Sequence, residues 1–459
     1  MSVFSLSNLK KTWYYLQKNG IRNAVWAVLE RIGQEQEDYT WQEPDEKTLS
    51  FQREHSASLR ISIVVPTYRT KKEHLEAMLN SVSNQSYLHW ELIVADAGDT
   101  AESVQAWAQK NGICLREAAD ASNLAEWKDQ SIVLCTLSEN KGISANTNAG
   151  IELAAGDAVG LLDHDDLLTA NALWEIADCL EKEKKRGKQK LVLFSDEDKC
   201  DGAASRFYEP NFKPDFDGEL LLTNNYICHF TVIETAFLKE LKLRSGFDGA
   251  QDYDLVLRAY AAGGQFVHVP KVLYHWRCHE ASTASNPQSK RYAYEAGQRA
   301  LEDYCLRKGW KATVNGLKHL GFYREDYEGS VFCQRPEIGI LAKPLPGGRD
   351  VFGIRHPKGF LVSGLYENDG SMRYAGLRKG YSGPMHRAAL QQSAPAADLR
   401  SMEVCSALKE RCEQAMEELK DACQGLPTVA QEKKILQKSM EFCKEAAAAG
   451  YGILWDPQA

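Results

Sequence analysis

The chain of 459 residues is predicted to be an α/β protein with a mostly parallel sheet flanked by helices. Two observations support this fold class. From residue 61 onward, short apolar runs alternate with segments of helical periodicity, which is the pattern of a parallel sheet with crossover helices. Several apolar runs also lead directly into acidic turns, and the ligand sites of open α/β sheets lie beyond the carboxyl ends of their strands.

Residues 1–33 carry apolar side chains at helical spacing and are interrupted by Asn19-Gly20, which predicts two helices. Residues 34–60 are polar and are expected to form a linker. The alternation that follows predicts strands at 61–65, 90–95, 113–116, 131–136, 158–162 and 191–194, and helices near 75–82, 143–155 and 170–182.

The run 181–190 is rich in lysine and is expected to be a solvated loop. Beyond about residue 330 the alternation fades. The expected domains are therefore an N-terminal helical segment with linker (1–60), an α/β domain (61–325) and a smaller, degenerate α/β region (326–459).

Composition excludes several classes of protein. Apolar residues make up 44% and charged residues 26%, which is usual for globular proteins. The net charge of −8 argues against a nucleic-acid partner, because nucleic-acid-binding domains are usually basic. No apolar run is long enough to span a membrane, and no secretory signal is recognisable. Twelve cysteines without a C-x-x-C pair indicate reduced thiols in a cytoplasmic protein.

The strongest chemical signal is Asp163-His164-Asp165-Asp166, directly after an apolar strand. Clustered carboxylates repel one another unless a cation compensates, and Mg²⁺ or Mn²⁺ would do so together with substrate phosphates. The alternative is a polar turn whose acids favour a helix N-terminus. Both interpretations stay open at this point.

Three further groups are candidates. Thr67, Tyr68 and Asp96 follow neighbouring strands and would border the same crevice, although each also suits a turn. Asp252 or Asp254 could act as a general base or simply begin a helix. In the segment 274–279, an arginine could bind phosphate and one histidine could bind a metal.

Residues 61–310 as a set resemble the family 2 glycosyltransferases, which have the GT-A (Rossmann-like) fold. The motifs occur in the family's order: Val65-Pro-Thr-Tyr68, Ile93-Val-Ala-Asp96, Asn140-Lys-Gly142 with Asn146 and Asn148, Leu162-Asp-His-Asp-Asp166, Gln251-Asp252-Tyr-Asp254 and Arg277-Cys-His279. Four variants are similar to a bacterial subgroup that builds cell-surface polysaccharides: Asp163-His-Asp-Asp166, Ser195-Asp-Glu-Asp-Lys199, Phe212-Lys-Pro-Asp215 and Tyr274-His-Trp-Arg277.

The resemblance implies an inverting transfer of a sugar from a nucleotide-diphosphate sugar to a saccharide or lipid-linked acceptor, with Mn²⁺ or Mg²⁺ as cofactor. It assigns Asp252 as the base. It implies nucleotide contacts for Pro66, Thr67, Tyr68, Asp96, Asn140, Gly142, Asn146 and Asp163. The implied metal ligands are Asp163, Asp165 and His279, with His275 as an alternative histidine. Acceptor or phosphate contacts are expected from Asp196, Asp198, Gln251, Asp254, His275 and Arg277.

Two departures from the family pattern stand out. Gln251 replaces the usual Glu before the base, as in the bacterial subgroup. Ala97 replaces the second polar position of the common Asp-Asp-Gly-Ser turn, which leaves the choice of nucleotide open.

Beyond residue 326, Gly359–Gly376 and Ala449–Pro457 resemble a second transferase module that lacks its nucleotide-binding half. It is also related to the first module by a weak repeat at an offset of 187 residues, in which Ser439 replaces the base. We expect an inactive, truncated module.

Other functions remain as alternatives. A carbohydrate-binding or scaffold protein of transferase descent would keep the fold without catalysis. A haloacid-dehalogenase-type phosphatase also uses Asp-x-Asp after a strand, but Leu167 stands where that motif usually has Thr or Val. The basic residues of 1–33 could dock the protein at the inner face of the plasma membrane, or these helices could pack on the catalytic domain.

Overall fold

The computed structural model describes residues 39–118, 128–213, 215–278, 291–316, 320–329, 334, 338–342, 403–404 and 452–455. The helices expected in 1–33 lie outside the described residues, as do Gly359–Gly376 and Ser439. In the described parts of the chain, no helix is long and apolar enough to cross a membrane.

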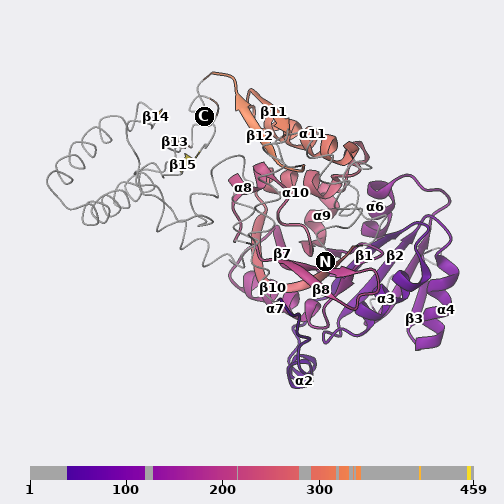
Figure 1. Ribbon diagram of the computed structural model, residues 1–459. Helices are drawn as coiled ribbons and strands as arrows, with labels where there is room; N and C mark the ends of the chain where they lie inside the picture. Colours follow the sequence, from indigo (N-terminus) through magenta and orange to yellow (C-terminus); the bar gives the residue numbers. More distant parts are fainter. Residues whose placement is uncertain are drawn as a thin grey trace, which may run out of the picture.

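The core is a ten-stranded sheet (Figure 1) with the order β3-β4-β2-β1-β5-β9-β7-β10-β6 and with β8 paired to β7. Apart from the short β6, its strands are runs of four or more residues. They are β1 (Ile61–Thr67), β2 (Trp90–Asp96), β3 (Cys114–Glu117), β4 (Ser131–Thr136), β5 (Ala158–Leu161), β6 (Leu167–Leu168), β7 (Leu191–Asp201), β8 (Phe207–Asn211), β9 (Thr231–Glu234) and β10 (Gln265–Cys278).

The sheet is mostly parallel, as predicted. β1 pairs in parallel with β2 and with β5, so the chain leaves β1 in one direction and returns on its other side. This is a topological switch point, where ligands bind in open α/β sheets. β9 runs antiparallel between β5 and β7. The start of β9 therefore lies at the same edge as the carboxyl ends of β5 and β7.

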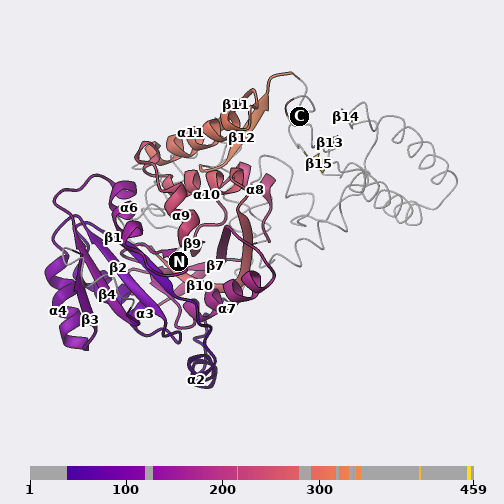
Figure 2. The same ribbon diagram turned by 180° about the vertical axis from the view of Figure 1, so that it is seen from behind.

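Helices cover both faces of the sheet (Figures 1 and 2). On one face Leu79 of α3 and Ile176 of α7 belong to the same buried cluster as Ile63, and on the other Ile151 of α6 and Leu255 of α10 belong to the same cluster as Val64. The alternation of Ile63 and Val64 between two cores is what a strand buried on both faces requires. The helices are α2 (Glu46–Glu54), α3 (Lys72–Ser83), α4 (Ala101–Asn111), α6 (Ile143–Leu153), α7 (Ala172–Lys185), α8 (Gly218–Thr223), α9 (Thr235–Leu241), η1 (Ser245–Phe247), α10 (Gln251–Ala261) and α11 (Arg291–Arg307).

Three local predictions were wrong. The expected linker 34–60 contains α2, whose first turn is capped by a 2.7 Å hydrogen bond from the Thr48 amide to Asp45. The expected loop 181–190 begins inside α7, which continues to Lys185 because Lys182 and Lys185 pair with acids one turn earlier. The strand expected at 191–194 continues through Asp201.

The described C-terminal pieces form two small sheets. β11 (Ala312–Gly316) and β12 (Tyr323–Tyr327) pair antiparallel, so the expected boundary at 325 falls inside β12. β13 (Ile338–Ala342) pairs antiparallel with β14 (Glu403–Val404) and parallel with β15 (Gly452–Trp455). The order β14-β13-β15 repeats the order and strand directions of β9-β7-β10. The truncated second module stays a prediction.

Candidate active site

The acidic turn after β5 is fastened to β10. Asp166 is buried and accepts hydrogen bonds from the Tyr274 hydroxyl at 2.5 Å and the Arg277 amide at 2.7 Å. The Arg277 guanidinium donates to the backbone carbonyl of Asp165. Since these contacts occupy Asp166, the turn leaves the Asp163 side chain 47% exposed at the edge of the sheet.

The carboxylates of this turn repel one another. Partial burial raises the pKa of Asp163, the charges of Asp165 and Asp252 add to the increase, and His229 opposes it. Burial, together with Asp165 and Asp163, raises the pKa of Asp166 well above its ordinary value. A divalent cation would relieve this repulsion, and carboxylate oxygens are the ligands that Mg²⁺ prefers.

Asp163 and Asp165 therefore fit a divalent cation. The described residues contain no complete group of three ligands, and the predicted third ligand, His279, lies outside them. The other candidate, His275, does not reach this turn: its Nδ1 lies 2.5 Å from Asp198, and its ring packs on Trp41 and Phe207.

The ends of β1 and β2 are joined by Asp96. Its buried carboxylate accepts hydrogen bonds from the Thr67 hydroxyl at 2.8 Å and from the amides of Gly98, Thr100 and Ala101. These four donors use the usual acceptor positions of a carboxylate, so Asp96 holds the turn into α4. That Asp96 also accepts a nucleobase N–H stays a prediction.

Tyr68 and Pro66 lie beside this turn. Tyr68 is 40% exposed and lies against Gly98, where an added Cβ would stand 3.3 Å from its ring. Pro66 sits in β1 two residues beyond the last residue that pairs with β5, so its missing N–H breaks no bond to that strand. The pair borders the switch point, where we expected the nucleotide.

Asn140, Gly142 and Asn146 build the turn into α6. Asn140 accepts hydrogen bonds from the Gly142 amide at 3.1 Å and the Asn146 side chain at 2.9 Å. Gly142 has a φ of +95°, which favours glycine, and a Cβ there would strike Asp248. The three residues thus order the loop, and their contact with a nucleotide stays a prediction.

Asp252 lies in the first turn of α10. Its Oδ2 accepts a hydrogen bond from the Asn225 side chain at 2.8 Å, and the Tyr253 hydroxyl fixes this turn to the Leu221 carbonyl at 2.7 Å. The charge of Asp252 raises the pKa of Asp163. The fold has therefore brought the predicted base within electrostatic reach of the acidic turn.

Other predicted contacts serve the fold. Asp254 is buried between Arg244 and Arg258, and Gln251 accepts the Gly249 amide at 2.8 Å. Asp196 is buried and bonded to His268 and to the Lys213 amide, both at 2.8 Å. Arg277 is 2% exposed. Arg277 holds the backbone of the acidic turn, whereas Asp254, Gln251 and Asp196 are not brought to that turn. Direct ligand contacts by these four residues remain untested.

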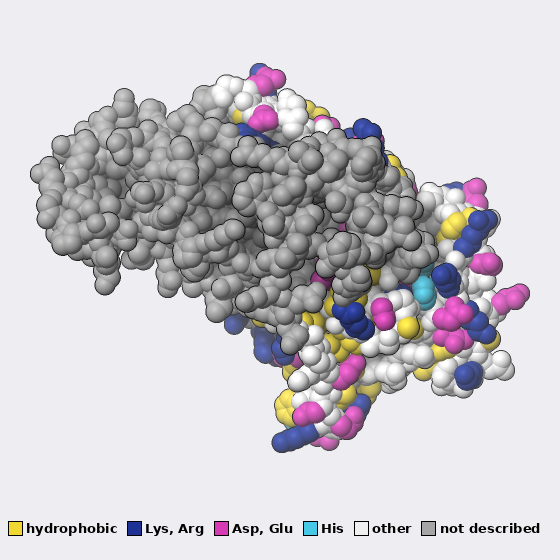
Figure 3. All heavy atoms as spheres, viewed as in Figure 1, with side chains coloured by type: hydrophobic (Ala, Val, Ile, Leu, Met, Phe, Trp, Pro, Cys, Tyr) yellow, Lys and Arg dark blue, Asp and Glu magenta, His cyan; other side chains and the backbone are white. Residues whose placement is uncertain are grey.

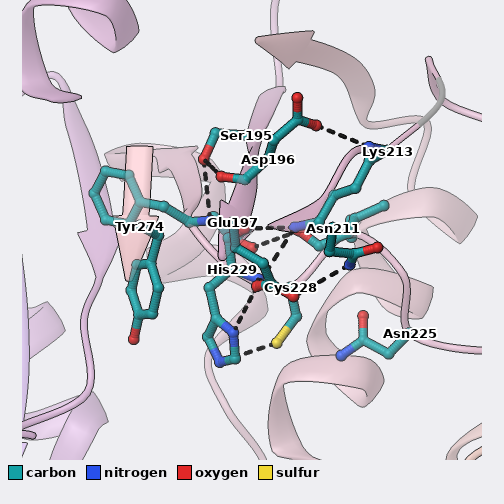
Figure 4. A network of polar contacts seen from close by, with 12 residues as sticks. Ser195, Asp196, Glu197, Asn211, Lys213, Asn225, Cys228, His229 and Tyr274 are labelled. Atoms are coloured by element: carbon teal, nitrogen blue, oxygen red, sulfur yellow. Dashed lines mark hydrogen bonds and ion pairs between the residues drawn. The ribbon is translucent and has the colours of Figure 1, made fainter. Parts of the chain in front are cut away.

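Figure 4 shows a buried network that the sequence did not single out as a site. Glu197 accepts hydrogen bonds from the His229 amide at 2.7 Å and from Asn211 at 3.2 Å, and its Oε2 lies 3.1 Å from His229 Nδ1. The Lys213 ammonium lies 3.7 Å from the same carboxylate. His229 Nε2 faces Asp163 Oδ2 at 3.9 Å.

The charges of this network shift the pKa values of Glu197 and His229 in opposite directions. Although burial opposes it, Lys213 and His229 lower the pKa of Glu197 to about 2. Burial likewise opposes a charged imidazole, but contacts with Cys228 and Glu197 raise the pKa of His229 well above its ordinary value. The carboxylate of Glu197 is thus charged across the physiological pH range.

The missed residues had weak sequence signals. Glu197 and Lys213 lie in the motifs Ser195–Lys199 and 212–215, which resemble the bacterial subgroup. His229 stands alone before an apolar run, and only the position of β9 beside β5 brings it to Asp163.

The model of the family "Glycosyl transferase family 2" matches residues 62–241, from β1 to the end of α9. This chain carries a glycosyl transferase family 2 domain. The mostly parallel sheet and this match confirm the predicted fold class, the GT-A fold of these glycosyltransferases.

Curated relatives of this glycosyltransferase domain come from bacteria. An uncharacterized protein of Sinorhizobium fredii is 36% identical over 255 residues, which make up 55% of this chain and 26% of that protein. The O-antigen biosynthesis protein RfbC of Myxococcus xanthus is 34% identical over 255 residues, 55% of this chain and 18% of that protein. The chain thus spans only about a quarter of the length of the first relative and less than a fifth of the length of the second.

A solved structure is also similar to this chain. Staphylococcus aureus TarS 1–349 in complex with UDP-GlcNAc has a TM-score of 0.40 and 15% identity, over 86% of this chain and 93% of that one. Since both values are low, the fold assignment rests on strand order and on the family model.

Proposed function

We propose that the protein is an inverting, metal-dependent glycosyltransferase of bacterial cell-surface polysaccharide synthesis. It would move a sugar from a nucleotide-diphosphate sugar to a saccharide or lipid-linked acceptor. The family domain supports the reaction class. The names of two relatives, an O-antigen biosynthesis protein and an amylovoran biosynthesis glycosyltransferase of Erwinia amylovora, support the polysaccharide context.

One observation carries the proposal. Asp252 and Asp163 come from α10 and from the turn after β5, yet the charge of one raises the pKa of the other. A transferase needs a carboxylate near the acceptor hydroxyl and a cluster of acids near the donor diphosphate. In this proposal the two carboxylates take those two roles beside the switch point of the sheet, which is the expected place for such a donor.

The chain's residues would share the work as follows. Pro66, Thr67 and Tyr68 would border the nucleotide, with Asp96 holding the turn beside it. Asp163 and Asp165, with His279 as the predicted third ligand, would hold Mn²⁺ or Mg²⁺. Such a cation supplies positive charge for the leaving diphosphate.

Asp252 would act as the base. It would take the proton of the acceptor hydroxyl as that oxygen attacks the anomeric carbon, so the sugar is transferred in one displacement and no covalent enzyme intermediate is needed. The Asn225 hydrogen bond to Oδ2 leaves the other oxygen for that proton.

The test is a transfer assay with a panel of nucleotide sugars (UDP-glucose, UDP-galactose, UDP-GlcNAc, GDP-mannose and dTDP-rhamnose), with and without Mn²⁺. We expect nucleoside diphosphate to be released only when both the cation and an oligosaccharide acceptor are present. Binding of a nucleotide sugar without any transfer or hydrolysis would favour the inactive carbohydrate-binding alternative. Release of inorganic phosphate alone would favour a phosphatase.

We further propose a cytoplasmic location with docking of residues 1–33 on the inner face of the plasma membrane. On the face seen in Figure 3, acidic and basic side chains of the described residues are intermixed. The basic end of α7 is likewise paired, through Lys182 with Asp178 and Lys185 with Glu181. Co-sedimentation with anionic liposomes that is unchanged after deletion of residues 1–33 would refute the docking.

A further inference from the structure

His229 lies at the sheet edge that carries the candidate active site, one strand beyond the acidic turn. The strand order runs β1, β5, β9, β7, with Thr67 at the end of β1 and Asp163 beyond the end of β5. His229 stands two residues before β9, at the same edge. Neighbouring strands lie about 4.8 Å apart, so His229 is the next side chain beyond the acidic turn.

Two contacts of the His229 ring and one contact of the next residue fix the position of the imidazole. Its Nδ1 lies 3.1 Å from Glu197 Oε2, and its ring stacks on Tyr274 with centroids 4.8 Å apart. The next residue, Phe230, packs where Gly160 of β5 has no Cβ, since an added Cβ would stand 2.5 Å from its ring. Nδ1 is therefore committed to the fold, whereas Nε2 is hydrogen-bonded to the Cys228 Sγ at 3.1 Å and lies 3.9 Å from Asp163 Oδ2. A sugar hydroxyl at Nε2 would take the place of the thiol.

The groups that hold His229 are charged and buried. Side-chain exposure is 0% for Lys213 and 10% for Glu197. Lys213 donates to the His229 carbonyl as well as lying beside Glu197. A buried ion pair adds little net stability compared with apolar side chains of the same size. The presence of this ion pair at the edge of a candidate active site therefore indicates that it positions His229.

An aromatic side chain completes the surroundings. Trp276 is half-buried, and its ring centroid lies 5.8 Å from that of His229. It shares the face of β10 with Tyr274, because side chains alternate along a strand. A polar nitrogen, a carboxylate and an aromatic ring in one place suit a ligand with both hydroxyl groups and C–H faces.

We propose that His229 and Trp276 form the subsite for the donor's sugar, and that Glu197 and Lys213 are positioning residues for His229. This inference rests on the proposed function, because it takes the donor to be a nucleotide sugar. With the nucleotide over β1 and β2 and the diphosphate at Asp163 and Asp165, the sugar lies over β9 and β7. His229 Nε2 then contacts a sugar hydroxyl.

The experiment compares two ligands on the same variants of the full chain. The nucleotide sugar of the panel above that binds wild type most tightly is the first probe, and its nucleoside diphosphate is the second. Calorimetry with Mn²⁺ present gives both affinities. For His229→Gln we expect nucleotide-sugar binding to fall by about tenfold or more, since one hydrogen bond to the ligand is lost, while nucleoside-diphosphate binding changes less than about twofold.

Glu197→Gln tests the positioning role. We expect the same sugar-specific loss but a smaller one, because the imidazole remains and only its orientation is relaxed. His89→Gln is the matched control, since His89 precedes β2 at the opposite edge of the sheet and pairs with Asp129. Its two affinities should equal those of wild type. Thermal unfolding of each variant checks that the fold is kept, and Trp276→Leu provides a second sugar-side variant if Glu197→Gln does not fold.

The outcomes test the sugar subsite and the proposed function separately. Equal losses for both probes, or no loss for either, in His229→Gln would overturn the sugar subsite while leaving the transferase intact. If no nucleotide sugar in the panel binds wild type, the proposed function fails, and this inference fails with it.

Discussion

The Asn225 side chain donates a 2.8 Å hydrogen bond to Oδ2 of Asp252, joining the loop after α8 to the first turn of α10. The contact is well supported, because the adjacent Tyr253 hydroxyl ties the same turn to Leu221 at the end of α8. Asn225 thus fixes which carboxylate oxygen of Asp252 is free. The proposed base is oriented by a neighbour that the sequence patterns did not identify.

Removing this hydrogen bond should impair turnover more than binding. For Asn225→Ala we expect kcat to fall roughly 10- to 100-fold with unchanged donor affinity. Asn111→Ala, on the exposed end of α4, is the control. An unchanged kcat would exclude an orienting role for Asn225.

The hydroxyl of Tyr274 should stabilise the acidic turn. Tyr274→Phe leaves the buried Asp166 with the Arg277 amide as its remaining hydrogen-bond donor among the described contacts, and a lost bond to a buried carboxylate costs about 1–3 kcal/mol. Urea unfolding should show that loss, whereas the exposed Tyr292→Phe should stay within about 0.5 kcal/mol of wild type. Equal stabilities of the two variants would contradict this account of the turn.

Because of Glu197, the free energy of unfolding should depend on pH. Its folded pKa of about 2 lies below the unfolded value of about 4.3, so its contribution is fully present above that value and is lost as the pH falls through about 2. The shift corresponds to a stabilisation on the order of 3 kcal/mol. The difference in unfolding free energy between wild type and Glu197→Gln should therefore shrink as the pH falls from about 4.3 towards about 2. A pH-independent difference would count against the charged network.

Asp254 and Asp252 should behave differently although they lie one helical half-turn apart. Asp254→Asn removes the buried carboxylate that Arg244 and Arg258 share, although Arg244 keeps Asp303. Breaking a buried ion pair in this way should cost about 3–5 kcal/mol in stability. The folded fraction should retain its specific activity. Denaturation curves and activity per folded molecule measure the two effects, and a stable but inactive Asp254→Asn variant would assign Asp254 to catalysis instead.

Local patterns predicted the strands well where burial is complete. The runs beginning at Ile61, Trp90 and Ser131 are strands β1, β2 and β4, because apolar side chains on both faces leave few other structures. β7 was predicted too short since its acids resemble a turn. Buried acids are uncommon, and Asp196 and Asp198 are accommodated only because His268 and His275 on β10 meet them.

Part of the candidate site could be predicted because its residues adjoin local apolar patterns. Asp163 follows the apolar strand β5 and Asp252 lies in the first turn of the apolar helix α10, and in the fold the charge of Asp252 acts on Asp163. His229 could not be found this way. Its role depends on β9 entering antiparallel between β5 and β7, a pairing between distant segments that no local periodicity encodes.

The most direct measurement compares sugar transfer and donor binding in Asp252→Asn, with Glu240→Gln on α9 as a control carboxylate. If Asp252 is the base, donor affinity is kept, while transfer falls by about 10²–10⁴-fold for a lost general base. Near-normal transfer by Asp252→Asn would show that Asp252 is not the base.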